Sequence, residues 1–148
     1  MSLKEHIITE MKAAMKSGDK VRLSTIRLIT AALKQKEVDE RIELTDADVI
    51  SILDKLAKQR RESIKQFQEA NRVDLSDKEQ VELGIVQSFL PKQLSESEIN
   101  EIVIAAVAST GASEIKAMGQ VMAVIKPQLV GKADMSLVSK LVKDKLSA

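Results

Sequence analysis

Helical spacing of the apolar residues is the feature that most limits the fold of this chain. Apolar residues recur every three or four positions from end to end, and no segment alternates as a half-buried strand would. The first stripe, from Leu3 to Met15, predicts a helix that ends at Gly18. From Lys20 to about Val38 nearly every face is apolar, which is typical of a central helix covered by its neighbours. We therefore expect an all-α protein.

Two further helices are predicted before residue 90. Thr45 or Asp46 is placed to cap a long helix that runs to about Ala70. Ser76 is placed to cap the next helix, which carries Phe89. Residues 1–90 are thus expected to form an N-terminal bundle of about four helices.

The segment FLPKQLSESEI marks the expected domain boundary. Pro91 disfavours helix at Leu90, and Ser95 begins a capping box with Glu98. Residues 91–148 are therefore expected to form a small C-terminal domain of three helices. Its expected helix starts are Ser95, Ser113 and Asp134, and its expected helix ends are Ser109 and Lys126.

Composition excludes several classes of chemistry. The chain has no cysteine and a single histidine, His6, so thiolate zinc sites, cysteine nucleophiles and multi-histidine metal sites are excluded. No Rossmann fingerprint or phosphate-binding loop is present, and we expect no catalytic residue, no metal and no cofactor. The N-terminus lacks a signal-peptide pattern and no apolar run is long enough for a membrane span, so we expect a cytoplasmic protein.

Positive charge is concentrated at the C-terminal end. The formal net charge is only +1, but residues 115–148 hold six lysines against Asp134 and Asp144. A helical wheel places Ser136, Lys140 and Lys143 opposite the apolar side of the last helix. The candidate phosphate-binding set is Lys126, Lys132, Ser136, Lys140 and Lys143, joined by free N–H groups at the start of that helix.

A solvated lysine face, with Lys140 paired to Asp144, is the alternative interpretation of the same residues. The patch is smaller than those of dedicated DNA-binding domains, so no DNA partner is expected. The only aromatic residues are two phenylalanines, so any RNA contact would use phosphates and shape rather than base stacking.

Other singled-out residues have structural interpretations. Gly119 and Ala123, spaced i,i+4, form a small-residue notch that predicts close helix packing in preference to an approach by RNA backbone. Gly131 is expected in a turn and Asp134 at a helix cap. Arg60 falls inside an apolar stripe, which predicts an ion pair with a buried carboxylate in preference to an external anion.

Several segments together resemble the YqeY family. The strongest is MGQVMAVIKPQLVGKADMSLVSKLVKDKL from residue 118, and RLSTIRLITAALKQKEVDER, RRESIKQFQEANRVDL and SFLPKQLSESEI match in order before it. Ala123 and Met135 stand where that pattern has glycine. The family shares its C-terminal domain with the tail of the B subunit of the glutamine-dependent aminoacyl-tRNA amidotransferase, which grips tRNA.

The resemblance implies a non-catalytic accessory protein that binds tRNA or another structured RNA. It also implies a possible place in a translation-related protein complex. Two alternatives stay open: a helical protein-interaction module, and an accessory to a carbon–nitrogen ligase that uses glutamine as amido-N-donor. A contiguous lysine surface would favour the first function, whereas an exposed apolar patch would favour the interaction module.

Overall fold

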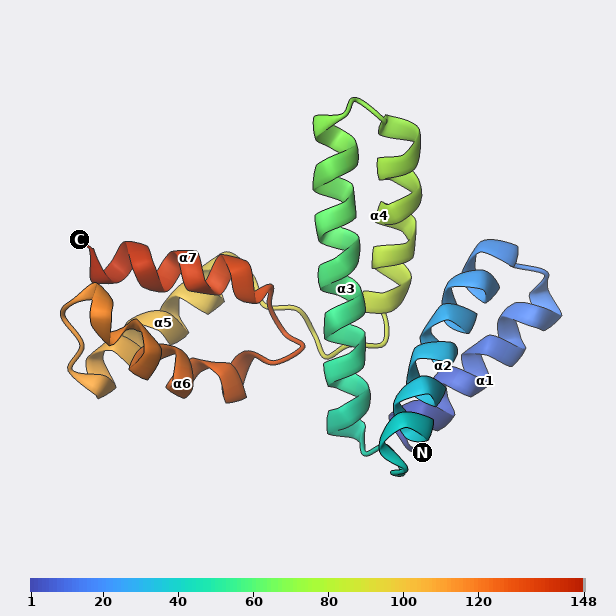
Figure 1. Ribbon diagram of the computed structural model, residues 1–148, viewed down its shortest axis with the longest axis horizontal. Helices are drawn as coiled ribbons and strands as arrows, with labels where there is room; N and C mark the ends of the chain where they lie inside the picture. The colour runs from blue at the N-terminus through green and yellow to red at the C-terminus, as the bar shows by residue number, and fades with distance from the viewer. Residues whose placement is uncertain (148) are drawn as a thin grey trace. The chain divides into compact units, whose positions relative to one another are not determined.

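The computed structural model describes residues 1–147, and all of their regular secondary structure is helical (Figure 1). Seven α-helices and one short 3-10 helix follow one another in these residues, with no strand. The expected all-α class is thus confirmed. The chain divides into two compact units, Met1–Pro91 and the residues from Lys92 onward, which we call the first and second units.

The first unit consists of two helical hairpins, one formed by α1 and α2 and the other by α3 and α4 (Figure 1). Their apolar faces meet in one core, in which Ile7, Ile26, Leu53 and Val86 are fully buried. The helices are α1 (Leu3–Ser17), α2 (Lys20–Glu40), α3 (Asp46–Glu69) and α4 (Val73–Gln87).

Local hydrogen bonds set most helix ends in the first unit. The Asp19 carboxylate accepts from the backbone N–H of Arg22 at 3.1 Å, so it caps α2. Gly18 ends α1 in the left-handed conformation, at φ 73°. Thr45 and Asp48 form a capping box at the start of α3.

Two expectations for the first unit are wrong. Ser76 does not cap α4, because the helix begins at Val73 after Asn71 reverses the chain at φ 56°. Ser76 instead lies buried within the helix. Helix α2 is also not covered on all sides: Val21, Leu28 and Val38 remain about half exposed or more, because its neighbours pack on only one side of it.

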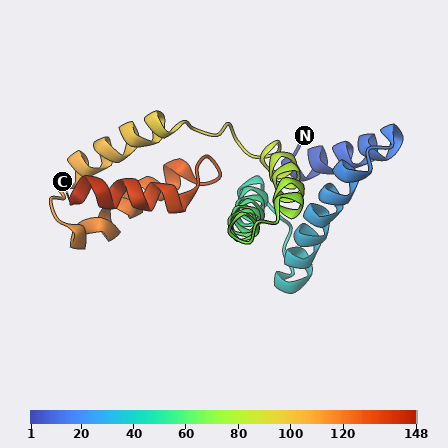
Figure 2. The same cartoon turned by 90° about the horizontal axis from the view of Figure 1, so that it is seen from above.

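The second unit packs three helices around a separate core (Figure 2). Val103, Val121, Ile125, Val138 and Val142 are fully buried there. The elements are α5 (Glu96–Thr110), a 3-10 turn (Ile115–Ala117), α6 (Met118–Leu129) and α7 (Met135–Leu146). Ser95 and Glu98 form the expected capping box before α5.

Helix α6 departs from the expected boundaries at both ends. It begins at Met118 after the 3-10 turn, so Ser113 is not its cap. It continues past Lys126 to Leu129 with Pro127 inside it. An interior proline costs about 3 kcal/mol. Burial of the Leu129 side chain, which is fully buried, returns about 1.5–3 kcal/mol and holds the last turn helical.

Within residues 1–147, no single helix is both long and apolar enough to cross a membrane. Helix α5 and residues 115–129 meet the length and composition criteria only as a pair, and that pair is bent by 97°.

Candidate nucleic-acid interface

The candidate lysines of α7 lie on its outer face. Val138, Val142 and Leu146 are buried against the core of the second unit. Ser136, Lys140 and Lys143 are exposed. Their spacing of four and three residues puts them in one row along the opposite side of the helix. The outer face of α7 therefore carries Ser136, Lys140 and Lys143, together with one exposed acid, Asp144, four residues after Lys140.

Lys132 projects from a turn that is fixed at both ends. The Lys132 N–H donates to the Leu129 carbonyl at 2.9 Å, and the Lys132 carbonyl accepts from the Leu94 N–H at 2.9 Å. The Gln93 side-chain amide donates to the Gly131 carbonyl at 2.6 Å. Gly131 is buried and has φ 74°, a conformation that favours glycine. The Lys132 side chain is exposed, so a rigid backbone presents this ammonium group to solvent.

Lys126 lies in the last turn of α6 and is exposed. None of the ion pairs identified within residues 1–147 includes Lys126, Lys132, Lys140 or Lys143, and the alternative pairing of Lys140 with Asp144 is not among them. Four ammonium groups thus follow the path from the end of α6 through the turn and along α7.

The start of α7 offers fewer free N–H groups than we expected there, because one of them is already bonded to a side chain of the chain itself. Asp134 is the N-cap, and its carboxylate accepts from the Ser136 N–H at 3.1 Å. A negative charge of the chain itself therefore occupies the place where a phosphate would interact with the helix N-terminus. Phosphate recognition at this surface would therefore depend mainly on the lysines and on the Ser136 hydroxyl.

The expectation of close helix packing at Gly119 and Ala123 is wrong. Both residues are exposed, and a Cβ added at Gly119 would meet no atom within 4 Å. The physical reason is the phase of α6: its buried stripe is Val121, Ile125 and Leu129, which puts Gly119 and Ala123 on the outer side.

Arg60 of α3 faces Glu82 of α4 in the first unit. Its Nε is 3.7 Å from a carboxylate oxygen of Glu82, and the two side chains are 13% and 15% exposed. The same Nε is buried and has no hydrogen-bond partner within the described residues. The guanidinium is therefore close enough to Glu82 for electrostatic attraction but does not make a well-directed hydrogen bond to it.

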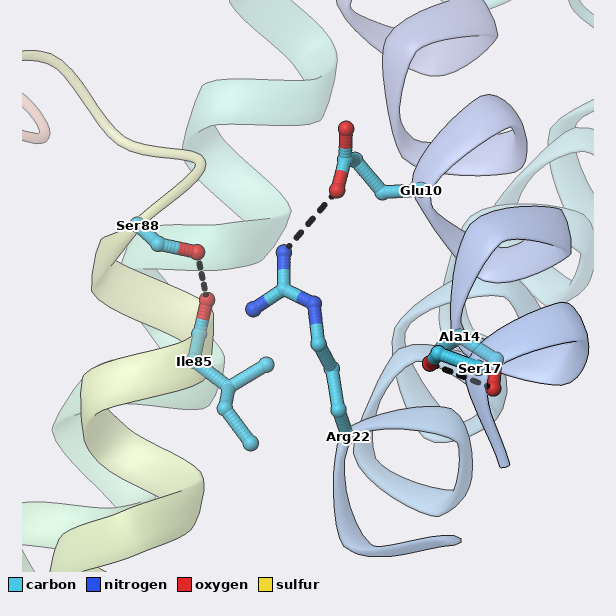
Figure 3. A network of polar contacts seen from close by, with 6 residues as sticks. All are labelled: Glu10, Ala14, Ser17, Arg22, Ile85 and Ser88. Atoms are coloured by element: carbon cyan, nitrogen blue, oxygen red, sulfur yellow. Dashed lines mark hydrogen bonds and ion pairs between the residues drawn. The ribbon is translucent and has the colours of Figure 1, made fainter. Parts of the chain in front are cut away.

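Arg22 is held within the first unit and is not free for an external anion. Figure 3 shows its side chain extending from α2 toward Glu10 of α1, near Ile85 in the last turn of α4 and Ser88 just after that helix. The Arg22–Glu10 ion pair measures 3.2 Å, and the guanidinium lies 5.6 Å from the centre of the Phe89 ring. Arg22 therefore joins α1, α2 and the end of α4.

Sequence reasoning missed one exposed surface, the outer face of α2. Val21 and Leu28 are exposed there beside Lys20 and Arg27. A signal for it was present, since residues 20–36 contain five basic residues and no acidic one. No group of three or more potential metal ligands occurs in residues 1–147.

Curated relatives of this chain include fungal proteins named "Altered inheritance of mitochondria protein 41, mitochondrial". The relative from Pyrenophora tritici-repentis is 33% identical over 144 residues, which cover 94% of this chain and 78% of that protein. The relative from Eremothecium gossypii is 38% identical over 86 residues, 57% of this chain and 47% of that protein. The relative from Saccharomyces cerevisiae is 33% identical over 94 residues, 62% of this chain and 50% of that protein.

The chain thus spans about half the length of the second and third of these relatives. The expectation of a cytoplasmic protein is contradicted by these relatives, because their names point to mitochondria. The model of the Yqey-like protein family matches residues 4–146, nearly the whole chain and both of its units. On this match, the chain belongs to the Yqey-like protein family.

Proposed function

We propose that the second unit binds structured RNA, with tRNA as the first candidate, through the phosphates of the backbone. The observation that carries the proposal is the run of exposed lysines, Lys126, Lys132, Lys140 and Lys143, for which no acidic partner is found within residues 1–147. Ammonium groups on a rigid surface form charge-assisted hydrogen bonds to phosphate oxygens.

The same surface predicts low sequence preference. Both phenylalanines, Phe67 and Phe89, belong to the first unit, and the chain has no tyrosine or tryptophan. The second unit therefore offers no aromatic ring on which a base could stack. Recognition would rest on phosphate spacing and shape, and an accessory role in glutamine-dependent tRNA amidation would be a narrower form of the same proposal.

The test is a mobility-shift titration of purified chain with bulk tRNA. Four phosphate contacts predict binding that weakens roughly 50- to 150-fold between about 50 and about 200 mM salt. Replacing Lys126, Lys132, Lys140 and Lys143 by glutamate should abolish the shift. Replacing Lys140 alone by glutamine should reduce the slope of log affinity against log salt by about 1.

A charge-matched variant separates a specific surface from net charge. Glutamate at Lys12, Lys58, Lys65 and Lys78 changes four exposed lysines of the first unit. Both sets lower the formal net charge by eight, from +1 to −7. The proposal fails if the two variants lose the same affinity, or if the unmodified chain does not bind tRNA at low salt.

A further inference from the structure

The outer face of α2 carries a row of residues with the spacing of a coiled-coil seam. Successive members are three, four, three, four and three positions apart, which corresponds to positions a and d of a heptad. All are exposed, and the three large apolar members, Val21, Leu28 and Val38, are 54%, 48% and 63% exposed. We call this row the α2 seam: Val21, Ser24, Leu28, Ala31, Gln35 and Val38.

The size pattern of the seam suits a helix as partner. Large side chains at Val21, Leu28 and Val38 are interrupted by the small Ser24 and Ala31, so a facing helix could approach closely and insert side chains between them. A shallow depression of about 380 Å³ lies beside the first half of the seam. Its lining residues are Lys20, Leu23, Ser24, Arg27 and Leu28.

One flank of the seam is uniformly basic. Lys20, Arg27 and Lys34 are seven residues apart, so each precedes a seam residue by one position and occupies heptad position g. None of the three belongs to an ion pair identified within residues 1–147. Other basic residues of α2 are used internally, since Arg22 pairs with Glu10 and Lys36 pairs with Glu40 at 2.5 Å.

We propose that α2 docks an amphipathic helix of another protein, one with apolar residues at a and d and acidic residues beside them. Such a helix would bury the exposed members of the seam and pair its carboxylates with Lys20, Arg27 and Lys34. A flat layer of phosphates would match the three cations but would leave the apolar residues of the seam without a partner.

A second copy of this chain would fit the α2 seam poorly, because its charges would not complement those of the seam. In an antiparallel pair of α2 helices the g positions face each other, which would bring Lys20, Arg27 and Lys34 against like charges. In a parallel pair they would face the e positions, where Thr25 is 1% exposed in its own unit and Ala32 is uncharged, so only Lys34 would meet an acid, Asp39. A second copy would thus pair at most one of the three cations, whereas a helix with acidic residues along its flank would pair all three, so charge complementarity favours a different, acidic helix.

The test uses two synthetic peptides of about three heptads, the length of the seam, both with isoleucine at a and leucine at d. One carries glutamate at all e and g positions and the other carries lysine, and like-charge repulsion keeps each from pairing with itself. Binding to the full chain is measured by fluorescence anisotropy. The acidic peptide should bind and the basic peptide should not.

Charge-reversed variants sharpen the test. Glutamate at Lys20, Arg27 and Lys34 should weaken the acidic peptide roughly 10- to 100-fold and create binding of the basic peptide. In a chain that keeps Lys20, Arg27 and Lys34, the single change Leu28→Glu should remove binding of the acidic peptide. Glutamate at Lys58, Lys65 and Lys78, which are exposed on α3 and α4, makes the same change in net charge and should leave peptide binding unaltered. Circular dichroism checks that every variant is folded.

Several results would overturn the proposal. They are equal binding of both peptides, no binding of the acidic peptide at about millimolar concentration, and an equal loss in the α3–α4 control. Sedimentation that revealed a dimer broken by Leu28→Glu would assign the seam to a second copy instead. Binding to phosphatidylcholine–phosphatidylglycerol vesicles that disappeared in the same variants would assign it to a membrane surface.

Discussion

Arg60 and Glu82 offer a test of what an imperfect buried ion pair contributes to the first unit. Their charged groups are 3.7 Å apart and their side chains are 13% and 15% exposed. At such a distance and an effective dielectric constant of about 20, the attraction is worth about 4 kcal/mol. Desolvation costs several kcal/mol for each ion, and the Arg60 Nε has no hydrogen bond to offset it within the described residues. The pair should therefore contribute little net stability.

Removing one partner should cost more than replacing both. Arg60→Ala leaves the Glu82 carboxylate without its partner and removes packed methylene groups, so the free energy of unfolding of the first unit should fall by about 2–4 kcal/mol. Glu82→Gln should cost about 1–3 kcal/mol, because the guanidinium loses its counter-charge. Arg60→Met combined with Glu82→Leu should return to within about 1 kcal/mol of the original chain.

The assay must report on the first unit alone. The chain has no tryptophan or tyrosine, so urea unfolding is followed by circular dichroism, and amide exchange in α3 and α4 identifies the unit that unfolds. Unchanged stability of Arg60→Ala would refute the reasoning. So would a double replacement that is as unstable as the worse single variant, since the pair would then be a net stabilising interaction.

Two further predictions concern the second unit. Gly131→Ala should lower its free energy of unfolding by about 1–2 kcal/mol, because φ 74° is strained for alanine, and amide exchange in α6 and α7 should speed up accordingly. Backbone and side-chain hydrogen bonds with Ser95 hold the pKa of Glu98 below its usual value. The folded-state pKa is thus below the unfolded one, so this contribution is present above the unfolded-state pKa and is lost as the pH falls through the folded-state pKa. The protection of α5 amides from exchange should therefore decrease as the pH falls, and Glu98→Gln should make this protection less dependent on pH. An unaltered pH profile would show that Ser95 does not stabilise the carboxylate.

The helix ends that follow from local chemistry were the predictable part of the fold. Asp19, Ser95 with Glu98, and Asp134 all cap helices at the positions that their spacing indicates. A cap needs only a side-chain oxygen and an N–H group two or three residues away, so neighbouring residues can indicate it, although Ser76 and Ser113 met the same local rule and do not cap their helices. Gly18 ended α1 for an equally local reason.

Packing between residues far apart in the sequence determined the helix ends and the exposed helix faces that sequence reasoning predicted wrongly. Pro127 suggested an end near Lys126, but burial of Leu129 in the core of the second unit keeps α6 helical beyond it. Gly119 and Ala123 suggested a helix contact, but none of the helices described in the second unit covers that side of α6. The apolar character of α2 predicted a covered helix, and which of its sides the other helices leave open depends on the whole first unit. Composition alone does not tell a buried stripe from a docking surface.

The near-neutral net charge conceals both proposed basic surfaces. The chain has 23 basic and 22 acidic residues, which suggests a balanced exterior. Many of the acids are engaged within the fold, as helix caps such as Asp19 and Asp134 or as partners of a basic residue such as Glu10 and Glu82. A capping carboxylate such as Asp19 is directed at backbone N–H groups and belongs to no ion pair identified within residues 1–147, so similar totals of acidic and basic residues do not mean that every lysine has an acidic partner. Sorting acids by what they bond therefore locates cationic surfaces in this chain better than its net charge does.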